Sequence, residues 1–459
     1  MKASGESPSK SVPVQKDWTK GSIARNLLGL SWPIIISESL YLVLILDMFW
    51  VAKLGAAAMA GMGIARIVGF LMMSGRWGLI VGTKAMVARL VGAGDTKAAN
   101  HTAIQAFVVC TIYVVVVGAI GIVLAEPILK LFGMDAEVVR QGVAYMRIMF
   151  GEMMAMGLWF LAETIMQASG DTMTPMKISV LVRLLQAALC PALVFGWWLF
   201  PSLGISGVSL SNTLTFSLGT SIGFFYLFNG RTRLKLTLKD FHFDPGTVWR
   251  IVKLGIPASV MGIQSNFGWT VLMKILAPFG TPAVAGQALV GRLEMAVHLP
   301  PMAIGSGAGV LVGQNLGAHQ PERAVKSGWL AAAFVEGFVL LVCTVPLLWA
   351  EDIVRTFNTD PALVEIGSAF FKISVIGYVM MGLTFALQPC ISSAGDTLPP
   401  MLISTGMMWT TLIPLALLLP KVSSLGVYGV RWAVVSSWIV EAIAYTIYFS
   451  LGRWKRKEV

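Results

Sequence analysis

The sequence predicts an all-α integral membrane protein, in which twelve transmembrane helices form two six-helix lobes related by a parallel internal repeat. Three observations lead to this fold class: an apolar composition, twelve apolar segments and a motif that occurs twice. Of the 459 residues, 56% are hydrophobic and only 12% are charged, whereas soluble domains carry about 25% charged residues. A chain this apolar needs a lipid environment.

The twelve apolar segments are each long enough to cover the hydrocarbon core of a bilayer, which is roughly 30 Å thick. They do not alternate apolar with polar residues as the strands of an outer-membrane barrel do. We therefore expect helices, which satisfy their own backbone hydrogen bonds in lipid. The predicted spans are 27–52, 57–83, 102–125, 139–168, 176–200, 206–229, 249–278, 283–311, 325–349, 363–391, 400–420 and 428–451.

Lysine and arginine indicate the orientation of these spans. The N-terminal tail, the second loop with Lys84, Arg89 and Lys97, the sixth loop and the C-terminal tail are all basic. Twelve crossings place these segments on one face, and basic loops stay in the cytoplasm. Both termini are therefore predicted to be cytoplasmic, with the protein in the inner membrane of a bacterium.

A ten-residue phrase occurs twice in the chain. QASGDTMTPM begins at Gln167 and SSAGDTLPPM begins at Ser392, 225 residues later, and five positions are identical. LGAAAMAG and FGTPAVAG, from Leu54 and Phe279, match at the same spacing. Because each copy holds six spans, both copies begin on the same face. Transporters use such repeats to bind substrate between two halves that rock against each other. The alternative is a duplicated structural bundle without transport.

The repeat also sets the domain organisation. Each GDT phrase is explained as a turn, with glycine ending one helix, Asp-Thr capping the next and proline in its first turn. Asp171 and Asp396 are therefore not expected to couple ions. The predicted units are a cytoplasmic tail (1–24), an N-lobe (25–229), a cytoplasmic linker (230–248), a C-lobe (249–452) and a basic cytoplasmic tail (453–459).

Three features together resemble the multidrug and toxic compound extrusion (MATE) family: two six-helix halves, the segment VGQNLGAHQPERA (312–324) and a GDT-x-x-P loop after the fourth span of each half. The resemblance extends from about Ile23 to Gly452. It implies an antiporter that exports amphipathic, often cationic drugs in exchange for inward H⁺ or Na⁺. It also implies a V of two lobes around a central cleft.

Asp47 is the leading candidate for ion coupling. It lies in the apolar segment LVLILDMFWVAKLG, and an acid inside a membrane is costly and usually functional. Burial favours the protonated carboxyl group, so such an acid can exchange a proton near neutral pH. The resemblance implies the same role, because the family carries an aspartate at this place in the first helix. The alternative is a structural salt bridge to Lys53 or to an arginine of the second span.

The chain departs from the family pattern at two other acids. The fifth helix of the family often reads N-x-x-L-D-P, whereas this chain reads QAALCP from Gln186, with Cys190 in place of the acid. The family's glutamate in the seventh helix is also missing, and Gln264 and Asn266 occupy that neighbourhood. These departures favour coupling in the first half, and H⁺ over Na⁺.

Three further residues are candidates for ion coupling. Glu163 lies on the fourth span, where a hydrogen bond that packs two helices is the alternative role. Glu294 and His298 are four residues apart in the eighth span and share one helix face. A His–Glu pair could relay protons. The alternative there is a bent helix with a satisfied ion pair.

Aromatic and polar residues of the spans form the candidate substrate-binding set. The 25 methionines and 10% aromatic residues suit a pliable apolar pocket, although packing in the core or against lipid is the default for such residues. The candidates are Phe49, Trp50, Trp77, Gln186, Gln264, Asn266 and Trp269.

Basic residues within the spans support a different substrate. Arg76 and Arg183 lie too deep in their spans to reach the membrane surface easily, and Arg431 is also intramembrane. If several of these arginines face the cleft, the substrate would be anionic. The chain would then be a flippase for an anionic lipid-linked precursor.

Motifs of enzymes and of cofactor sites are missing from the sequence. It has no nucleophile motif, no metal cluster and no phosphate loop, and its four cysteines lie inside apolar runs as buried thiols. We expect a transporter and not an enzyme, with no metal and no cofactor beyond the coupling ion. The expected partners are amphipathic small molecules and the bilayer, with no nucleic acid, and the protein is expected to be a monomer.

Overall fold

The computed structural model describes residues 16–131, 136–197, 200–239, 241–422 and 424–457. Within these ranges every regular element is a helix. The α-helices are α1 (Ile23–Ser39), α2 (Leu44–Ala52), α3 (Ala56–Gly92), α4 (Thr96–Leu131), α5 (Ala136–Ser169), α6 (Met173–Phe195), α7 (Ile205–Phe228), α8 (Pro245–Leu276), α9 (Thr281–Gly317), α10 (Pro321–Phe357), α11 (Pro361–Ser393), α12 (Leu398–Met407), α13 (Ile413–Val422) and α14 (Val427–Leu451). Short 3₁₀ or π segments are η1 (Leu40–Val43), η2 (Ala277–Phe279), η3 (Met408–Leu412) and η4 (Arg453–Arg456).

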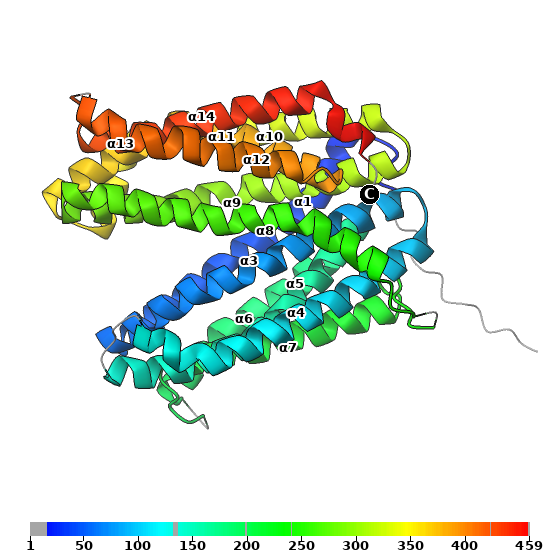
Figure 1. The fold of residues 1–459 in the computed structure, drawn as a ribbon, viewed down its shortest axis with the longest axis horizontal. Coiled ribbons are helices and arrows are strands. Elements are labelled where there is room, and N and C mark those ends of the chain that lie inside the picture. The colour runs from blue at the N-terminus through cyan, green and yellow to red at the C-terminus, as the bar shows by residue number, and fades with distance from the viewer. Residues whose placement is uncertain (1–15, 132–135, 198–199, 240, 423, 458–459) are drawn as a thin grey trace, which may run out of the picture.

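The helices form two bundles, one with α2–α7 and one with α9–α14 (Figure 1). The bundles meet at the end where the C-terminus lies and diverge toward the opposite end, which gives the molecule a V shape. With α1 and α2 as one crossing and α12 and α13 as another, the elements make twelve crossings. The predicted all-α class and two-lobe arrangement are confirmed.

Nine of the helices in the described ranges are long and apolar enough to cross a membrane by length and composition. The set leaves out α3, α7 and α8. Two of these three, α3 and α8, carry lysine and arginine and pack against each other between the two bundles. Arg76 of α3 is 7% exposed and is therefore held within protein, where the bilayer tolerates such a charge.

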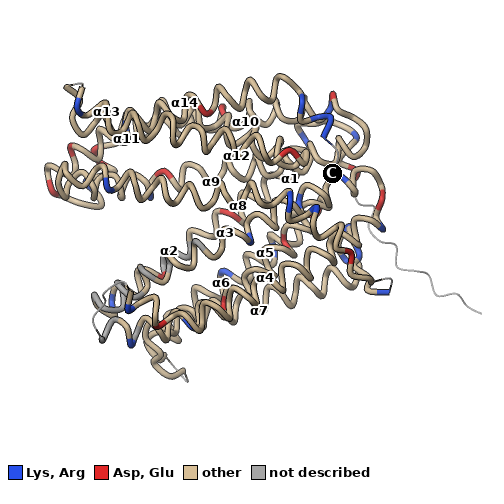
Figure 2. The backbone as a smooth tube through the Cα atoms, in the orientation of Figure 1, with Lys and Arg blue, Asp and Glu red and all other residues tan. Residues whose placement is uncertain are grey.

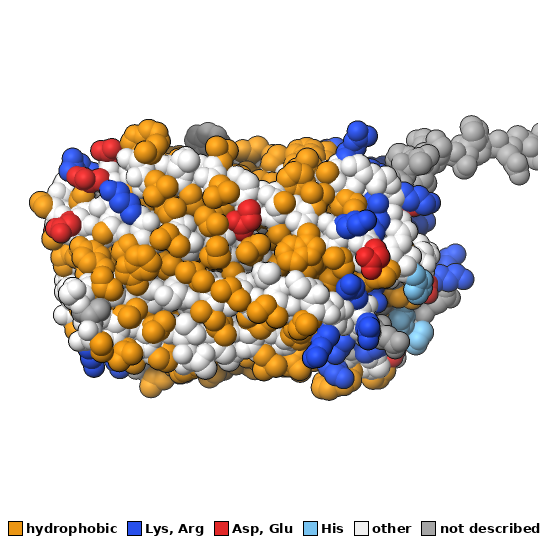
Figure 3. Space-filling model, turned by 90° about the horizontal axis from the view of Figure 1, so that it is seen from above, with side chains coloured by type: hydrophobic (Ala, Val, Ile, Leu, Met, Phe, Trp, Pro, Cys, Tyr) orange, Lys and Arg blue, Asp and Glu red, His pale blue; other side chains and the backbone are white. Residues whose placement is uncertain are grey.

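Many charged residues lie at the end where the lobes meet (Figure 2). Viewed from above, apolar side chains cover the middle of the molecule, and lysine, arginine and histidine lie mostly toward that same end (Figure 3). We call it the basic end. An apolar middle with a charged end is the pattern of a protein that spans a bilayer.

The first helix of each sequence copy packs against the opposite lobe. Helix α1 contacts α9 and α10, and α8 contacts α3 and α4. Leu27 and Leu30 of α1 are fully buried in the hydrophobic cluster of the C-lobe, and Ile251 of α8 is fully buried in a cluster of the N-lobe. Since α1 also contacts α6, and α8 also contacts α12 and α13, these two helices lie between the lobes and join them in addition to the linker.

Two crossings contain short segments that are not α-helical. The first changes from α1 to the 3₁₀ segment η1 and then to α2, and the eleventh passes through the π segment η3. Pro414 explains the second interruption, because it has no N–H to donate to the carbonyl four residues earlier. Such irregular turns inside a helix often mark a hinge.

Lys84 is not in a loop, as the sequence predicted, but within α3. This helix continues to Gly92, well beyond the predicted end of the second span at 83. The Lys84 ammonium donates to the Ser306 carbonyl oxygen at 3.0 Å and to its hydroxyl at 2.5 Å. Since Ser306 belongs to α9, Lys84 joins the two lobes.

Glycines allow α3 and α8 to approach closely. A Cβ atom on Gly78 would lie 2.3 Å from the carbonyl oxygen of Gly255 and 2.1 Å from the hydroxyl of Ser259. Both distances are far below van der Waals contact, so any side chain at Gly78 forces the helices apart. The two lobes therefore meet through backbone contact at this point.

We expect Gly78→Ala to lower the stability of the protein by about 1–3 kcal/mol, because overpacking displaces α8. The measurement is the midpoint of thermal unfolding in detergent. Gly63→Ala is the matched control, because Gly63 lies in the same helix and a Cβ there meets no heavy atom within 4 Å. Equal unfolding midpoints for the two variants would contradict this account of the α3–α8 contact.

Candidate functional site

Asp47 lies in a polar site built by three helices of the N-lobe. It occupies the first turn of α2 and is only 4% exposed. The Gln186 amide of α6 donates to its two carboxylate oxygens at 3.3 and 3.1 Å, and the Asn212 amide of α7 donates to Oδ2 at 3.3 Å. The Cys190 thiol lies beside the same carboxyl group.

Local sequence explains why these groups converge. Gln186 and Cys190 are four residues apart on α6 and therefore share one face of that helix. Asp47 follows the 3₁₀ segment η1, so it lies at the start of α2, where the helix dipole favours a carboxylate. The side chain thus has both local and tertiary support for holding a negative charge.

Arg183 brings a positive charge next to this site. Its guanidinium donates to Gln186 Oε1 at 2.7 Å, so the Gln186 amide connects Arg183 to Asp47. The same guanidinium lies 4.3 Å from the centre of the Tyr41 ring and 4.7 Å from that of Phe216, and it is 2% exposed. Cation–π contacts of this kind stabilise a buried guanidinium.

The salt-bridge alternative for Asp47 named Lys53 as a partner. In the structure the Lys53 ammonium lies over the rings of Phe49 and Trp50, at 4.6 and 4.9 Å from their centres. Its charge is therefore directed at aromatic faces. The contacts described for Asp47 itself are to amides and a thiol.

Glu163 extends the polar site toward the basic end. Its carboxylate accepts from Tyr41 at 3.5 Å and from Gln167 at 3.2 Å. Because Tyr41 also packs against Arg183, a chain of contacts through Tyr41, Arg183 and Gln186 links Glu163 to Asp47. The bond from Gln167, four residues along α5, is of the packing type that the sequence offered as the alternative role.

Sequence reasoning missed several members of this site. Asn212 and Tyr41 were not among the candidates, and Glu38 on α1 lies near enough to Lys84 and Arg183 to interact electrostatically. A signal was present for Glu38, since it is a second acid only nine positions before Asp47 in the same span. A further signal was an asparagine within the serine- and threonine-rich sixth span.

Glu294 of α9 is held in a separate polar cluster in the C-lobe. Its carboxylate forms an ion pair with Arg431 of α14 and accepts from the Tyr378 hydroxyl at 3.0 Å. Arg431 also donates to Ser374 at 2.6 Å and to Gln287 at 3.2 Å. Neither side chain of the ion pair is more than 6% exposed.

His298 does not share a hydrogen bond with Glu294. Its ring packs among aromatic rings, with centres 5.7 Å from Tyr378, 5.1 Å from Phe385 and 6.2 Å from Trp438. Its Nε2 atom is buried without a hydrogen-bond partner. The structure therefore brings Glu294 to an arginine rather than to the predicted histidine.

The predicted substrate-binding residues lie apart from one another. Gln264 of α8 donates to Ser404 of α12 at 3.4 Å, and Asn266 donates to the Gly262 carbonyl of its own helix at 2.9 Å. Trp50 packs on Phe195. Only Gln186 of this set contacts Asp47. The remaining candidates, with exposed fractions of 53%, 49% and 42%, are Phe49, Trp77 and Trp269.

Among the side chains that the structure describes, no group of three or more His, Cys, Asp or Glu residues could hold a metal ion. What the Asp47 site offers is one carboxylate, two amides, a thiol and a nearby guanidinium. Such a set can bind and release a proton.

Comparison with known proteins matches this architecture to one family. The MatE family model matches residues 33–192 and 257–418. These two segments correspond to the two copies of the internal repeat.

Relatives of known description are similar along most of the chain. A probable multidrug resistance protein, YpnP of Bacillus subtilis, is 26% identical over 447 residues, which cover 96% of this chain and 97% of that protein. An FAD transporter of Shewanella oneidensis is 25% identical over 397 residues, covering 86% and 88%. The solved outward-facing structure of a multidrug resistance MATE family transporter has a TM-score of 0.89 at 20% identity and covers 99% of this chain and 100% of that one.

Proposed function

The chain belongs to the MATE family of multidrug efflux transporters, and from that membership we propose that it is a proton-coupled antiporter. It exports amphipathic, mostly cationic compounds across the inner membrane of a bacterium in exchange for H⁺. The basic end faces the cytoplasm, in line with the distribution of lysine and arginine. The V shape, with the lobes in contact at that end, is the state open to the outside.

The observation that carries the choice of H⁺ is the guanidinium beside Asp47. Arg183 is joined to Asp47 through a single amide, so a fixed positive charge lies one residue away from the carboxylate that a sodium ion would have to bind. Two cations this close repel each other strongly in a medium of low dielectric constant. A proton avoids this repulsion, because it binds to the carboxylate itself and neutralises it.

Protonation of Asp47 would loosen the contact of α2 with the rest of the N-lobe. The ionised carboxylate accepts hydrogen bonds from α6 and α7, and bonds to a charged acceptor are about twice as strong as neutral ones. Loss of that charge weakens both bonds together. Since α2 is connected to α1 by the irregular segment η1, α2 can then change direction without moving α1.

In inverted vesicles, we expect the flow of protons out of the vesicle to drive the uptake of a drug into it. The vesicles carry the purified protein, and quenching of a fluorescent cationic dye reports its transport. An acid-inside pH gradient should drive dye accumulation, whereas a sodium gradient of equal size without a pH gradient should not. Accumulation driven by sodium alone would contradict proton coupling.

The second candidate function is transport of an anion, such as a lipid-linked precursor. One similar protein is described as an FAD transporter, and the basic residues within the spans favour the same alternative. In the structure Arg76, Arg183 and Arg431 are 7%, 2% and 1% exposed, so their charges serve contacts within the lobes. Transport of no cationic dye, together with movement of an anionic lipid, would favour this alternative.

A further inference from the structure

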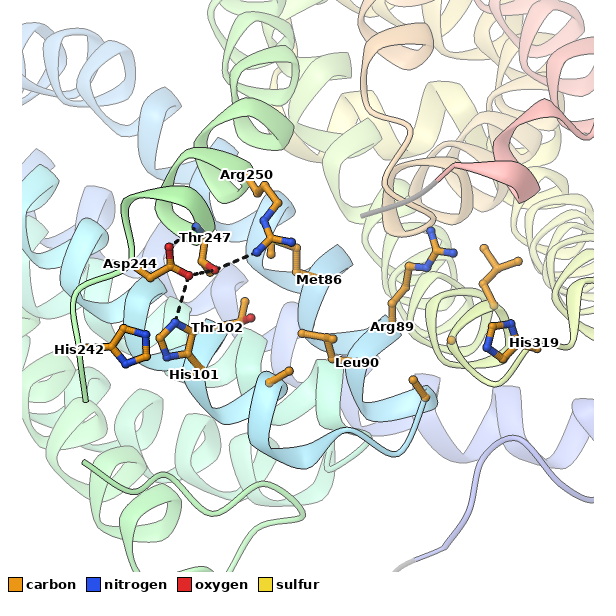
Figure 4. Close-up of a pocket in the computed structure, with 14 residues that line it drawn as sticks. Met86, Arg89, Leu90, His101, Thr102, His242, Asp244, Thr247, Arg250 and His319 are labelled. Atoms are coloured by element: carbon orange, nitrogen blue, oxygen red, sulfur yellow. Dashed lines mark hydrogen bonds and ion pairs between the residues drawn. The ribbon is translucent and has the colours of Figure 1, made fainter. Parts of the chain in front are cut away.

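A cavity of about 660 Å³ lies between the lobes at the basic end, and Asp47 is not among the residues that line it (Figure 4). It is bounded by the end of α3, the beginning of α4, the segment that leads into α8 and the end of α9. Both lobes and the linker therefore contribute to its wall. Its volume falls within the range of small-molecule sites, which is roughly 300–1,000 Å³.

The wall of this cavity is rich in basic side chains. Arg89 of α3, in the first sequence copy, and Arg250 of α8, in the second, both line the cavity. Three of the four histidines of the chain line it as well. Figure 4 shows His101, His242 and Arg250 on one side of the cavity and Arg89 and His319 on the other. The histidines are His101, His242 and His319.

The one carboxylate of the wall is already engaged. Asp244 caps α8, accepting from the Gly246 and Thr247 amides at 2.9 and 3.2 Å and from the Thr247 hydroxyl at 2.6 Å. It also lies 3.3 Å from His101 Nε2. The hydrogen bonds from Thr247 hold the pKa of Asp244 well below its ordinary value. This acid therefore stays ionised, and its single negative charge offsets only part of the positive charge that Arg89 and Arg250 bring to the wall.

Hydrogen bonds hold the basic groups in place. Arg250 donates to the Thr247 hydroxyl at 3.1 Å, and Arg89 donates to the Ala394 carbonyl oxygen at 3.0 Å. The His101 and His242 rings are stacked with centres 4.7 Å apart. A set of positioned donors costs less to bind an anion than flexible side chains do.

We propose that this cavity binds a phosphate-bearing anion that contacts both lobes at once. Guanidinium groups match phosphate oxygens in geometry and charge, and the volume accommodates a group larger than a single phosphate. The occupant is a soluble phosphate compound or the headgroup of an anionic lipid, since both present the same chemistry. Because its wall comes from both lobes, an occupant favours the state in which the lobes meet at this end.

The test measures, by calorimetry, the binding of inorganic pyrophosphate to the full-length protein in phosphatidylcholine nanodiscs. We expect saturable binding that Arg250→Gln weakens at least about tenfold, because a charge-assisted bond is lost. Arg250→Lys should retain part of the affinity. Arg231→Gln is the matched control, because Arg231 is an exposed arginine of the linker, while Arg250 belongs to α8, and Arg231 does not line the cavity.

Two outcomes would overturn the proposal: no saturable binding to the wild type in either nanodiscs or lipid-free detergent, or equal weakening by Arg250→Gln and Arg231→Gln. Nanodiscs that contain phosphatidylglycerol distinguish a soluble phosphate compound from a lipid headgroup as the occupant. If that lipid abolishes pyrophosphate binding, the headgroup is the occupant; if binding persists, a soluble anion is. Asp47→Asn should bind pyrophosphate normally, so this test stands apart from proton coupling.

Discussion

Replacing Asp47 with asparagine is expected to abolish proton-driven efflux while leaving insertion into the membrane intact. The amide has nearly the same shape as the carboxyl group but cannot bind and release a proton. It also removes the negative charge that Gln186 and Asn212 stabilise. Cells expressing the variant should accumulate a cationic dye to the level of cells without the transporter, and the same should hold at every external pH.

Asp171→Asn is the matched control for this variant. Asp171 belongs to the repeated GDT turn, where its side chain accepts from the Thr174 amide at 3.0 Å, and asparagine caps a helix about as well as aspartate. Efflux by this control should resemble that of the wild type. Efflux by Asp47→Asn that still depends on pH would remove Asp47 from the coupling mechanism.

Replacing Arg431 with methionine is expected to cause the largest loss of stability. The change leaves the Glu294 carboxylate buried without its ionic partner, and such a loss costs about 3–5 kcal/mol in soluble proteins. Ser374 and Gln287 would lose their bonds to the guanidinium as well. The measurement is the midpoint of chemical unfolding in detergent.

Two comparisons distinguish this effect from a general sensitivity to mutation. Adding Glu294→Gln to the Arg431→Met variant removes the unpaired charge and should restore much of the stability. Arg355→Met is the surface control, because Arg355 and Glu351 form an ion pair whose side chains are 59% and 55% exposed. Exposed pairs contribute about 0–1 kcal/mol, so equal losses for Arg431→Met and Arg355→Met would contradict a dominant buried ion pair.

The prediction of Asp47 shows what a single chain can reveal about a site. An acid within an apolar span stands out because the membrane penalises it, and no other residue is needed to notice it. Its neighbours were harder to find. Gln186 was singled out through the family pattern, but Asn212 is an ordinary polar residue until α7 is known to pack beside α2.

The pairing of Glu294 shows where reasoning from local spacing fails. The sequence placed His298 four residues away on the same helix face, and that proximity suggested a partner. The structure pairs Glu294 with Arg431, which is 137 positions away. A buried carboxylate is stabilised most by a permanently charged guanidinium, and only the fold shows which arginine can reach it.

The sequence by itself determined the membrane environment, the helical class and the duplicated plan, because composition, span length and repeated phrases are properties of the chain alone. It also singled out Asp47. Only the tertiary structure decided that α1 and α8 pack between the two lobes, that Lys84 joins the lobes and that basic groups line a cavity at their junction. The physical reason is that these spans are apolar on nearly every face, so periodicity does not tell a lipid-facing surface from a helix-facing one. Close backbone approaches, such as Gly78 against Gly255, select the neighbours instead.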